Sequence, residues 1–111
     1  MIYLMNSAVM PAGNFGTYVY VPAKFEDLTS VVKGECGPWA SSIGYQQNVD
    51  LIERWTGVRP EVNRAETKFL NGDLALVMRL TRRVAVGTKG QPVSENQKDW
   101  EFAWVTFTCA T

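Results

Sequence analysis

The sequence predicts one small domain, residues 1–111, that combines α-helices with β-strands. The chain has 111 residues, of which 46% are hydrophobic and 20% are charged, a composition typical of a globular protein with a single core. Several apolar runs rich in β-branched and aromatic residues have the length of strands. Two other segments repeat their apolar residues at the spacing of an amphipathic helix. These observations together predict a sheet covered by helices.

Two β-prone runs open the chain. Ile2–Met5 is predicted to form a strand that presents the polar residues Asn6 and Ser7 at its end. Thr17–Val21 alternates tyrosine and valine, which predicts a second strand, hairpinned to the first or close to it. The first strand thus delivers two polar side chains at its end.

Two segments have helical periodicity. Lys24–Lys33 carries apolar residues at i, i+3, i+6 and i+7, and Gly34 can end this helix in the left-handed conformation. Tyr45–Thr56 has an inner apolar stripe that begins at Val49, and Gly57 supplies its stop. We expect the first helix to cover the sheet and the polar start of the second to face away from the core.

The rest of the chain is predicted to be mainly strands. Short apolar or β-branched runs predict them at Trp39–Ile43, Pro60–Phe69, Leu74–Leu80 and Trp100–Cys109. The third of these is almost wholly apolar, which predicts a central strand buried on both faces. Leu70–Asp73 contains Asn-Gly, typical of a type I′ hairpin turn. Val84–Asp99 is longer than most connections and lacks periodicity, so residues 84–99 are a candidate lid.

Composition disfavours several classes of function. Lys+Arg and Asp+Glu number 11 each, so no net charge draws the chain to duplex DNA or to a membrane. No apolar run is long enough to span a bilayer, and the N-terminus lacks the features of a signal peptide, so we expect a cytoplasmic location. Cys36 and Cys109 are expected to be free, buried thiols rather than a disulfide or a zinc site.

The chain contains no histidine. This excludes a Ser-His-Asp triad, a Cys-His nucleophile, a histidine general acid and every zinc site that uses histidine. Paired carboxylates at metal-binding spacing, a P-loop and a dinucleotide-binding glycine motif are also absent from the sequence. We therefore expect no metal and no cofactor.

The start of the second predicted helix is the strongest candidate site. Ser41, Ser42 and Gly44 precede this helix, whose first N–H groups have no partner within the helix and carry partial positive charge. The sequence leaves two interpretations open, an ordinary serine cap or a phosphate-binding turn. Tyr45, at the helix start, is a candidate for stacking on a base.

Arginines form the second candidate set. Arg64 follows the Val-Asn pair. Period two, continued beyond the predicted central strand, places Arg79 and Arg83 on one face and Arg82 on the opposite face. Guanidinium groups suit phosphate oxygens. The alternative is that these arginines form surface ion pairs with nearby carboxylates.

Five short motifs occur in a set order along nearly the whole chain: Tyr3–Val9, Ser42–Gly44, Val62–Arg64, Gly72–Val77, and Arg83 with Gly87. Taken together, they resemble the small viral and bacterial ring nuclease family, the type III anti-CRISPR proteins that degrade cyclic tetra-adenylate. The resemblance implies an α+β fold, with a mixed sheet of about five strands and flanking helices. It also implies a homodimer that holds the cyclic ligand across a two-fold axis.

The resemblance also implies roles for individual residues. Family positions that line the ligand pocket fall on Asn6, Ser42, Arg64 and Arg83, with Arg79 one period earlier on the same face and with Ser7, Ser41 and Gly44 beside them. The catalytic histidine of the family follows Ile-Gly, and here that position is Tyr45. The acidic residue that follows the last arginine in the family is replaced by the apolar segment 84–86.

These departures leave three functional hypotheses. In the first, the protein binds a cyclic oligonucleotide or dinucleotide and sequesters it to counter host defence, in the host cytoplasm if the protein is viral. In the second, it is a metal-independent ring nuclease with Tyr45 in place of histidine, although a phenol gives up its proton less readily than an imidazolium. In the third, it inhibits a defence complex by direct protein contact through aromatic surface such as Trp39 and Trp100.

Overall fold

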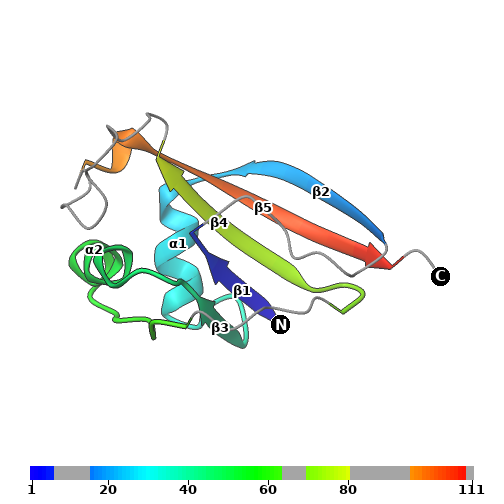
Figure 1. The fold of residues 1–111 in the computed structure, drawn as a ribbon, viewed down its shortest axis with the longest axis horizontal. Coiled ribbons are helices and arrows are strands. Elements are labelled where there is room, and N and C mark those ends of the chain that lie inside the picture. The colour runs from blue at the N-terminus through cyan, green and yellow to red at the C-terminus, as the bar shows by residue number, and fades with distance from the viewer. Residues whose placement is uncertain (7–15, 64–69, 81–95, 110–111) are drawn as a thin grey trace.

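The computed structural model describes residues 1–6, 16–63, 70–80 and 96–109. They form a mixed sheet with helices against it, the α+β fold that the sequence predicts (Figure 1). The strands are β1 (Ile2–Met5), β2 (Gly16–Ala23), β3 (Trp39–Ser42), β4 (Leu74–Leu80) and β5 (Trp100–Cys109). The helices are α1 (Phe25–Val32) and α2 (Gln46–Thr56), with a 3-10 turn, η1 (Gln97–Asp99), before β5.

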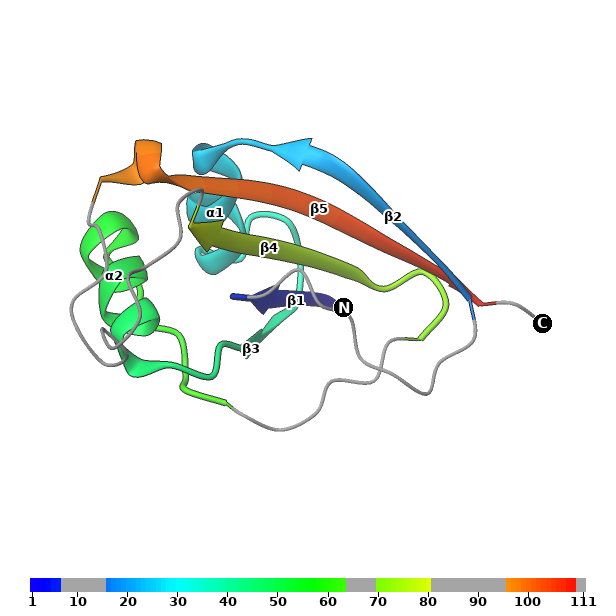
Figure 2. The same ribbon diagram turned by 45° about the horizontal axis from the view of Figure 1, so that its top comes forward.

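The strands lie in the order β2-β5-β4-β1-β3. β1 pairs in parallel with both β3 and β4, so Met5 lies level with Ser42 on one side and with Val77 on the other. β5 runs antiparallel to β4 and to β2. The carboxyl ends of β1, β3 and β4 therefore meet at one end of the sheet, and α2 lies at this end (Figures 1 and 2).

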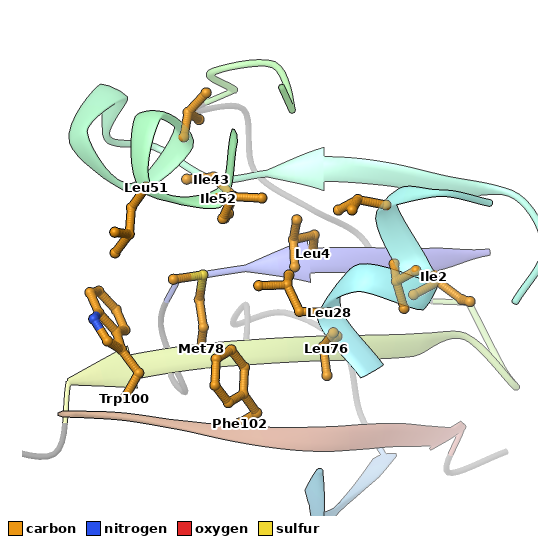
Figure 3. Close-up of a cluster of buried hydrophobic side chains, with 13 residues drawn as sticks. Ile2, Leu4, Leu28, Ile43, Leu51, Ile52, Leu76, Met78, Trp100 and Phe102 are labelled. Atoms are coloured by element: carbon orange, nitrogen blue, oxygen red, sulfur yellow. The ribbon is translucent and has the colours of Figure 1, made fainter. Parts of the chain in front are cut away.

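The main core lies between the helices and one face of the sheet. Alternate residues of β1, β4 and β5 meet the inner stripes of α1 and α2 there. In Figure 3, Leu28 of α1 lies beside Leu4 and Leu76, and Leu51 of α2 points toward Trp100. The apolar stripes predicted for both helices are thus confirmed.

The opposite face of the sheet carries a smaller apolar cluster. Its buried members come from β1, β4 and β5, and are Met5, Ala75, Val77, Val105 and Phe107. Tyr18 of β2 packs against this cluster, with its ring centroid 5.0 Å from that of Phe107. β4 is therefore buried on both faces, as predicted, and Arg79 is its one exposed residue.

The ends of the helices follow the sequence signals. Lys24 precedes α1, and its backbone N–H donates to the Asp27 carboxylate at 2.9 Å. Gly34 and Gly57 follow the two helices with φ of 78° and 79°, a conformation that glycine adopts without strain. The predicted stops are confirmed.

The predicted strand at Thr17–Val21 forms, but its predicted place beside β1 is wrong. β2 pairs with β5 along its whole length, and β5 and β4 lie between it and β1. Ten residues, 6–15, separate β1 from β2, whereas tight hairpin loops have about two to five. The non-local ladder with β5 decides the position of β2.

The predicted strand at Pro60–Phe69 is wrong for residues 60–63, and residues 64–69 lie outside the described part of the chain. Within 60–63 there is an isolated parallel bridge between Val62 and Ile43. Both edges of β4 are occupied, by β1 and β5, so residues 60–63 do not pair with it.

The predicted turn at Leu70–Asp73 forms, but not as a type I′ turn. The Leu70 C=O accepts a hydrogen bond from the Asp73 N–H at 2.9 Å. Gly72 has a φ of 87°, while Asn71 does not have a positive φ. A positive φ at the third position alone is the pattern of a type II turn.

Three other expectations concern loops and surface. Of the candidate lid, residues 84–95 lie outside the described chain, and its last residues form η1. Cys36 is free, as predicted, but it is exposed, so its predicted burial is wrong. It lies between Gly34 and Gly37 in the turn after α1, where these neighbours have no side chains to cover it. No helix in the described segments is long and apolar enough to cross a membrane.

The position of Leu76 in the main core predicts a large stability difference between two identical substitutions. Leu76 is fully buried, whereas Leu70 is 71% exposed. Leu76→Ala should lower the free energy of unfolding by about 2–5 kcal/mol, through lost burial and the cavity left behind. Leu70→Ala should change it by no more than about 0.5 kcal/mol. Urea denaturation of both variants measures this, and equal losses would contradict this assignment of the core.

Candidate functional site

Several of the predicted site residues gather at the carboxyl end of the parallel strands. Asn6 follows β1, and Ser42 closes β3 at the level of Met5. Neighbouring strands lie about 4.8 Å apart, so the residues that follow β1 and β3 are close neighbours. In open sheets, ligands commonly bind in the crevice outside the carboxyl ends of the strands.

α2 begins at this edge without a side-chain cap. Its N-cap residue is Tyr45, in extended conformation, and no side chain caps the helix. The Tyr45 C=O accepts from the N–H groups of Asn48 and Val49, at 3.2 and 3.3 Å. Among the described residues, the N–H groups of Gln46 and Gln47 have no partner. The serine-cap interpretation is therefore wrong, and the positive end of the helix faces the site.

Tyr45 is 44% exposed, so its ring is accessible at the start of α2, where the sequence places it. Gly44 and Ser42 precede it and are half-buried. The turn from β3 into α2 thus presents small side chains on the approach to the uncapped N–H groups, with one aromatic ring at its end.

Ser41 has a structural role at this edge. Its buried hydroxyl donates to the Glu61 C=O at 2.5 Å and accepts from the Ile43 N–H at 3.3 Å. Asn63 adds two bonds, from its side-chain Nδ2 to the Ser41 C=O at 3.0 Å and from its N–H to the Ile43 C=O at 2.8 Å. These bonds fasten residues 61–63 along the end of β3.

The connection from α2 to residue 63 is also tied to the helix itself. Arg59 Nη1 lies 2.7 Å from an Asp50 carboxylate oxygen and 3.2 Å from one of Glu53. These hydrogen bonds raise the pKa of Arg59 above its ordinary value, because they favour its charged form. Arg64 follows directly on the fastened segment, but Arg64, Ser7 and Arg83 lie outside the described residues.

Arg79 lies on β4 at the same end of the sheet, on the face away from the helices. Its Nε forms an ion pair with the carboxylate of Glu101, the residue directly opposite on β5. The ion-pair alternative therefore describes Arg79 in this structure. Both side chains are exposed, and exposed pairs contribute at most about 1 kcal/mol, so an incoming phosphate could compete with Glu101.

A cavity of about 780 Å³ lies at this end of the sheet, but over β2, β4 and β5. Most of its lining is apolar, and its residues on the face away from the helices are Tyr20, Pro22, Val77, Arg79, Glu101 and Ala103. Of the predicted site residues in the described part of the chain, Arg79 is the one that lines it. The N–H groups without partners among the described residues lie at the start of α2, and their residues, Gln46 and Gln47, do not line this cavity.

Sequence reasoning missed Asn48. The polar start of α2 was expected to face away from the core, yet Asn48 is only 7% exposed. It precedes the core residues Leu51 and Ile52 by three and four positions, so it continues their stripe into the first turn. This spacing was visible in the sequence and could have identified a polar residue on the inner face.

The aromatic surface that was expected at Trp100 is absent. Trp100 is buried, and its ring meets Trp55 edge to face with centroids 5.9 Å apart. Trp39 is half-buried. Among the residues that the structure describes, no group of three His, Cys, Asp or Glu side chains could hold a metal ion.

Two known proteins that resemble this chain come from viruses. ORF117, an uncharacterised protein of Acidianus two-tailed virus, is 26% identical over 96 residues, which cover 86% of this chain and 82% of that protein. B116 of Sulfolobus turreted icosahedral virus has a similar fold, with a TM-score of 0.69 and 21% identity over 95% of this chain and 97% of that one. The family model described as STIV B116-like matches residues 2–101. The chain therefore belongs to the STIV B116-like family, a family with viral members.

Proposed function

We propose that the protein binds a cyclic oligonucleotide second messenger at the carboxyl end of the sheet and sequesters it to counter host antiviral defence. The observation that carries this proposal is the uncapped start of α2, at the edge where Asn6 and Ser42 lie. Backbone N–H groups at the positive end of a helix dipole favour a phosphate. The viral origin of similar proteins and the resemblance of the motifs to ring nucleases support a counter-defence role.

The charge of the chain suits a small anionic ligand better than a long nucleic acid. The formal net charge is zero, whereas proteins that bind duplex DNA neutralise many phosphates with a basic surface. A cyclic oligonucleotide presents few phosphates, so neutral donors and a few arginines suffice. Arg79 is exposed at the same end of the sheet, and Arg64 and Arg83 remain predicted contributors.

We also propose that two copies of the chain share one ligand. A cyclic tetra-adenylate has rotational symmetry, and a two-fold dimer would offer it the same residues from both sides. Each protomer would then supply one α2 start and one copy of Asn6. A dimer would therefore offer the ligand twice as many hydrogen-bond donors as a single chain does.

Sequestration requires tight binding without cleavage. The chain has no histidine to protonate a leaving oxygen, and general acid catalysis typically contributes about 10²- to 10⁴-fold in rate. A site that keeps its phosphate donors but lacks this acid would hold its ligand intact.

Binding to cyclic tetra-adenylate tests the proposal directly. After incubation with this ligand and with a panel of smaller cyclic nucleotides, the protein is separated, denatured and its ligand chromatographed. We expect to recover intact ligand. Its Kd should be lower than about 100 μM, which corresponds to a binding free energy of roughly −5.5 kcal/mol. Absence of binding to every member of the panel at that level would refute the proposal.

Asn6 should contribute to that affinity. Asn6→Ala removes a side chain that follows β1 at the site, and it should weaken binding about tenfold, the effect of roughly one hydrogen bond to a charged group. Asn71→Ala is the matched control, because Asn71 precedes β4 at the opposite end of the sheet. Titration calorimetry compares the two variants, and an equal effect of both would argue against this location for the ligand.

A second function, cleavage by a metal-independent ring nuclease, is favoured by one observation. Tyr45 is accessible at the N-cap of α2, where the resemblance places the catalytic histidine. If the protein cleaves its ligand through this phenol, Tyr45→Phe should abolish the linear product with a 2′,3′-cyclic phosphate while binding persists. Chromatography of a timed reaction measures this. If the wild-type protein returns only intact ligand, the cleavage hypothesis is refuted.

A further inference from the structure

Asn48 is a polar side chain in α2 that core packing does not explain. It is 7% exposed, in the first turn of the helix, on the side that Val49, Leu51 and Ile52 present to the core. An apolar residue here would extend the stripe by one more turn. The position is therefore suited to leucine or isoleucine, yet it carries an amide.

The Asn48 side-chain amide has no hydrogen-bond partner among the described residues. Buried amides are nearly always paired, because leaving one unpaired destabilises the fold. By comparison, the half-buried hydroxyl of Thr56, near the other end of the same helix face, is paired, since it donates to the Ile52 C=O at 2.7 Å. Asn48 is thus an exception within its own helix.

The amide is nevertheless not sealed inside the core. Neither polar atom of this amide is among the fully enclosed side-chain atoms that lack a hydrogen bond within the described segments. The Asn48 amide therefore keeps a narrow contact with solvent.

Helix geometry gives the direction in which Asn48 points. The Cα–Cβ bonds of a helix tilt toward its N-terminus, so a side chain covers the turn before its own Cα. The Asn48 amide is therefore directed toward the first turn of α2, where the N–H groups of Gln46 and Gln47 have no partner among the described residues. The Asn48 amide and the two backbone N–H groups thus all belong to the first turn of α2.

We propose that Asn48 is a ligand-binding residue, whose side-chain N–H donates to a phosphate oxygen of the cyclic nucleotide seated on the first turn of α2. This inference rests on the proposed function and deepens it, because it names the group that the helix start binds. The amide side chain and two backbone groups supply neutral donors to one charged acceptor, and hydrogen bonds of this kind are stronger than neutral ones. The ligand satisfies the amide that the fold leaves unpaired.

The decisive variant is Asn48→Leu, measured in the full chain. Leucine continues the apolar stripe and removes the unpaired amide, so the Tm without ligand should rise by several degrees. The affinity for cyclic tetra-adenylate should fall at least tenfold. A residue that only supported the fold would show the reverse, with a lower Tm and unchanged affinity.

Two further variants serve as a control and as a second test of the inference. Thr56→Val, on the same helix face, removes a satisfied hydroxyl, so it should lower the Tm and leave affinity unchanged. Asn48→Asp has almost the same shape as the wild type but places a carboxylate near the phosphate, so it should weaken binding at least as much as leucine does. This variant also tests the inference if Asn48→Leu does not fold.

The outcomes separate this inference from the proposed function. If the wild-type protein binds cyclic tetra-adenylate and both Asn48 variants bind it equally well, the inference is overturned and the proposed function stands. If the wild-type protein binds no cyclic nucleotide in the panel, both are overturned. A higher Tm together with weaker binding in Asn48→Leu supports the inference.

Discussion

The parallel pairing of β1 with both β3 and β4 is the constraint on which the rest of the structure depends. β1 has four residues, and its two ladders set Met5 level with Ser42 and Val77. Parallel neighbours need crossover connections, so the chain must pass over the sheet between them. α1 and α2 lie on these crossovers and cover one face. The same pairing brings the start of α2 to the carboxyl ends of the strands, so the site is a consequence of the topology.

Features that depend on neighbouring residues could be predicted from the sequence, and features that depend on distant ones could not. The apolar run of β4, the stripes of both helices and the stop at Gly57 are local, and the structure confirms them. The partner of β2 is β5, more than 75 residues away in sequence, and local composition carries no information about it. At the candidate site, Ser42 and Tyr45 lie at the start of α2, as predicted. Asn48 was missed because it follows two glutamines, which indicate a polar turn.

The two helices differ in how their first turns are capped and in which residues they bury. In α1, the backbone N–H of Lys24 is bound by the Asp27 carboxylate, and the buried residues of the helix are all apolar. In α2, no side chain caps the start, and Asn48 occupies a core position. Both features of α2 lower stability, and both occur in the same turn. Local violations of good folding rules are expected where a protein binds something, because the ligand supplies the missing partners.

A ligand-binding role also accounts for a neutral chain without histidine. An enzyme must bind its transition state more tightly than its substrate, and the acid that assists the leaving group is part of that difference. A protein that only holds its ligand needs ground-state affinity, for which backbone N–H groups, an amide and arginines suffice. Arg79, now paired with Glu101 on the surface, can exchange that weak pair for a phosphate at little cost. Tight binding with slow release would slow a ring nuclease, because each turnover requires the product to leave the site. In a sequestering protein, the same slow release keeps the ligand bound, which is what sequestration requires.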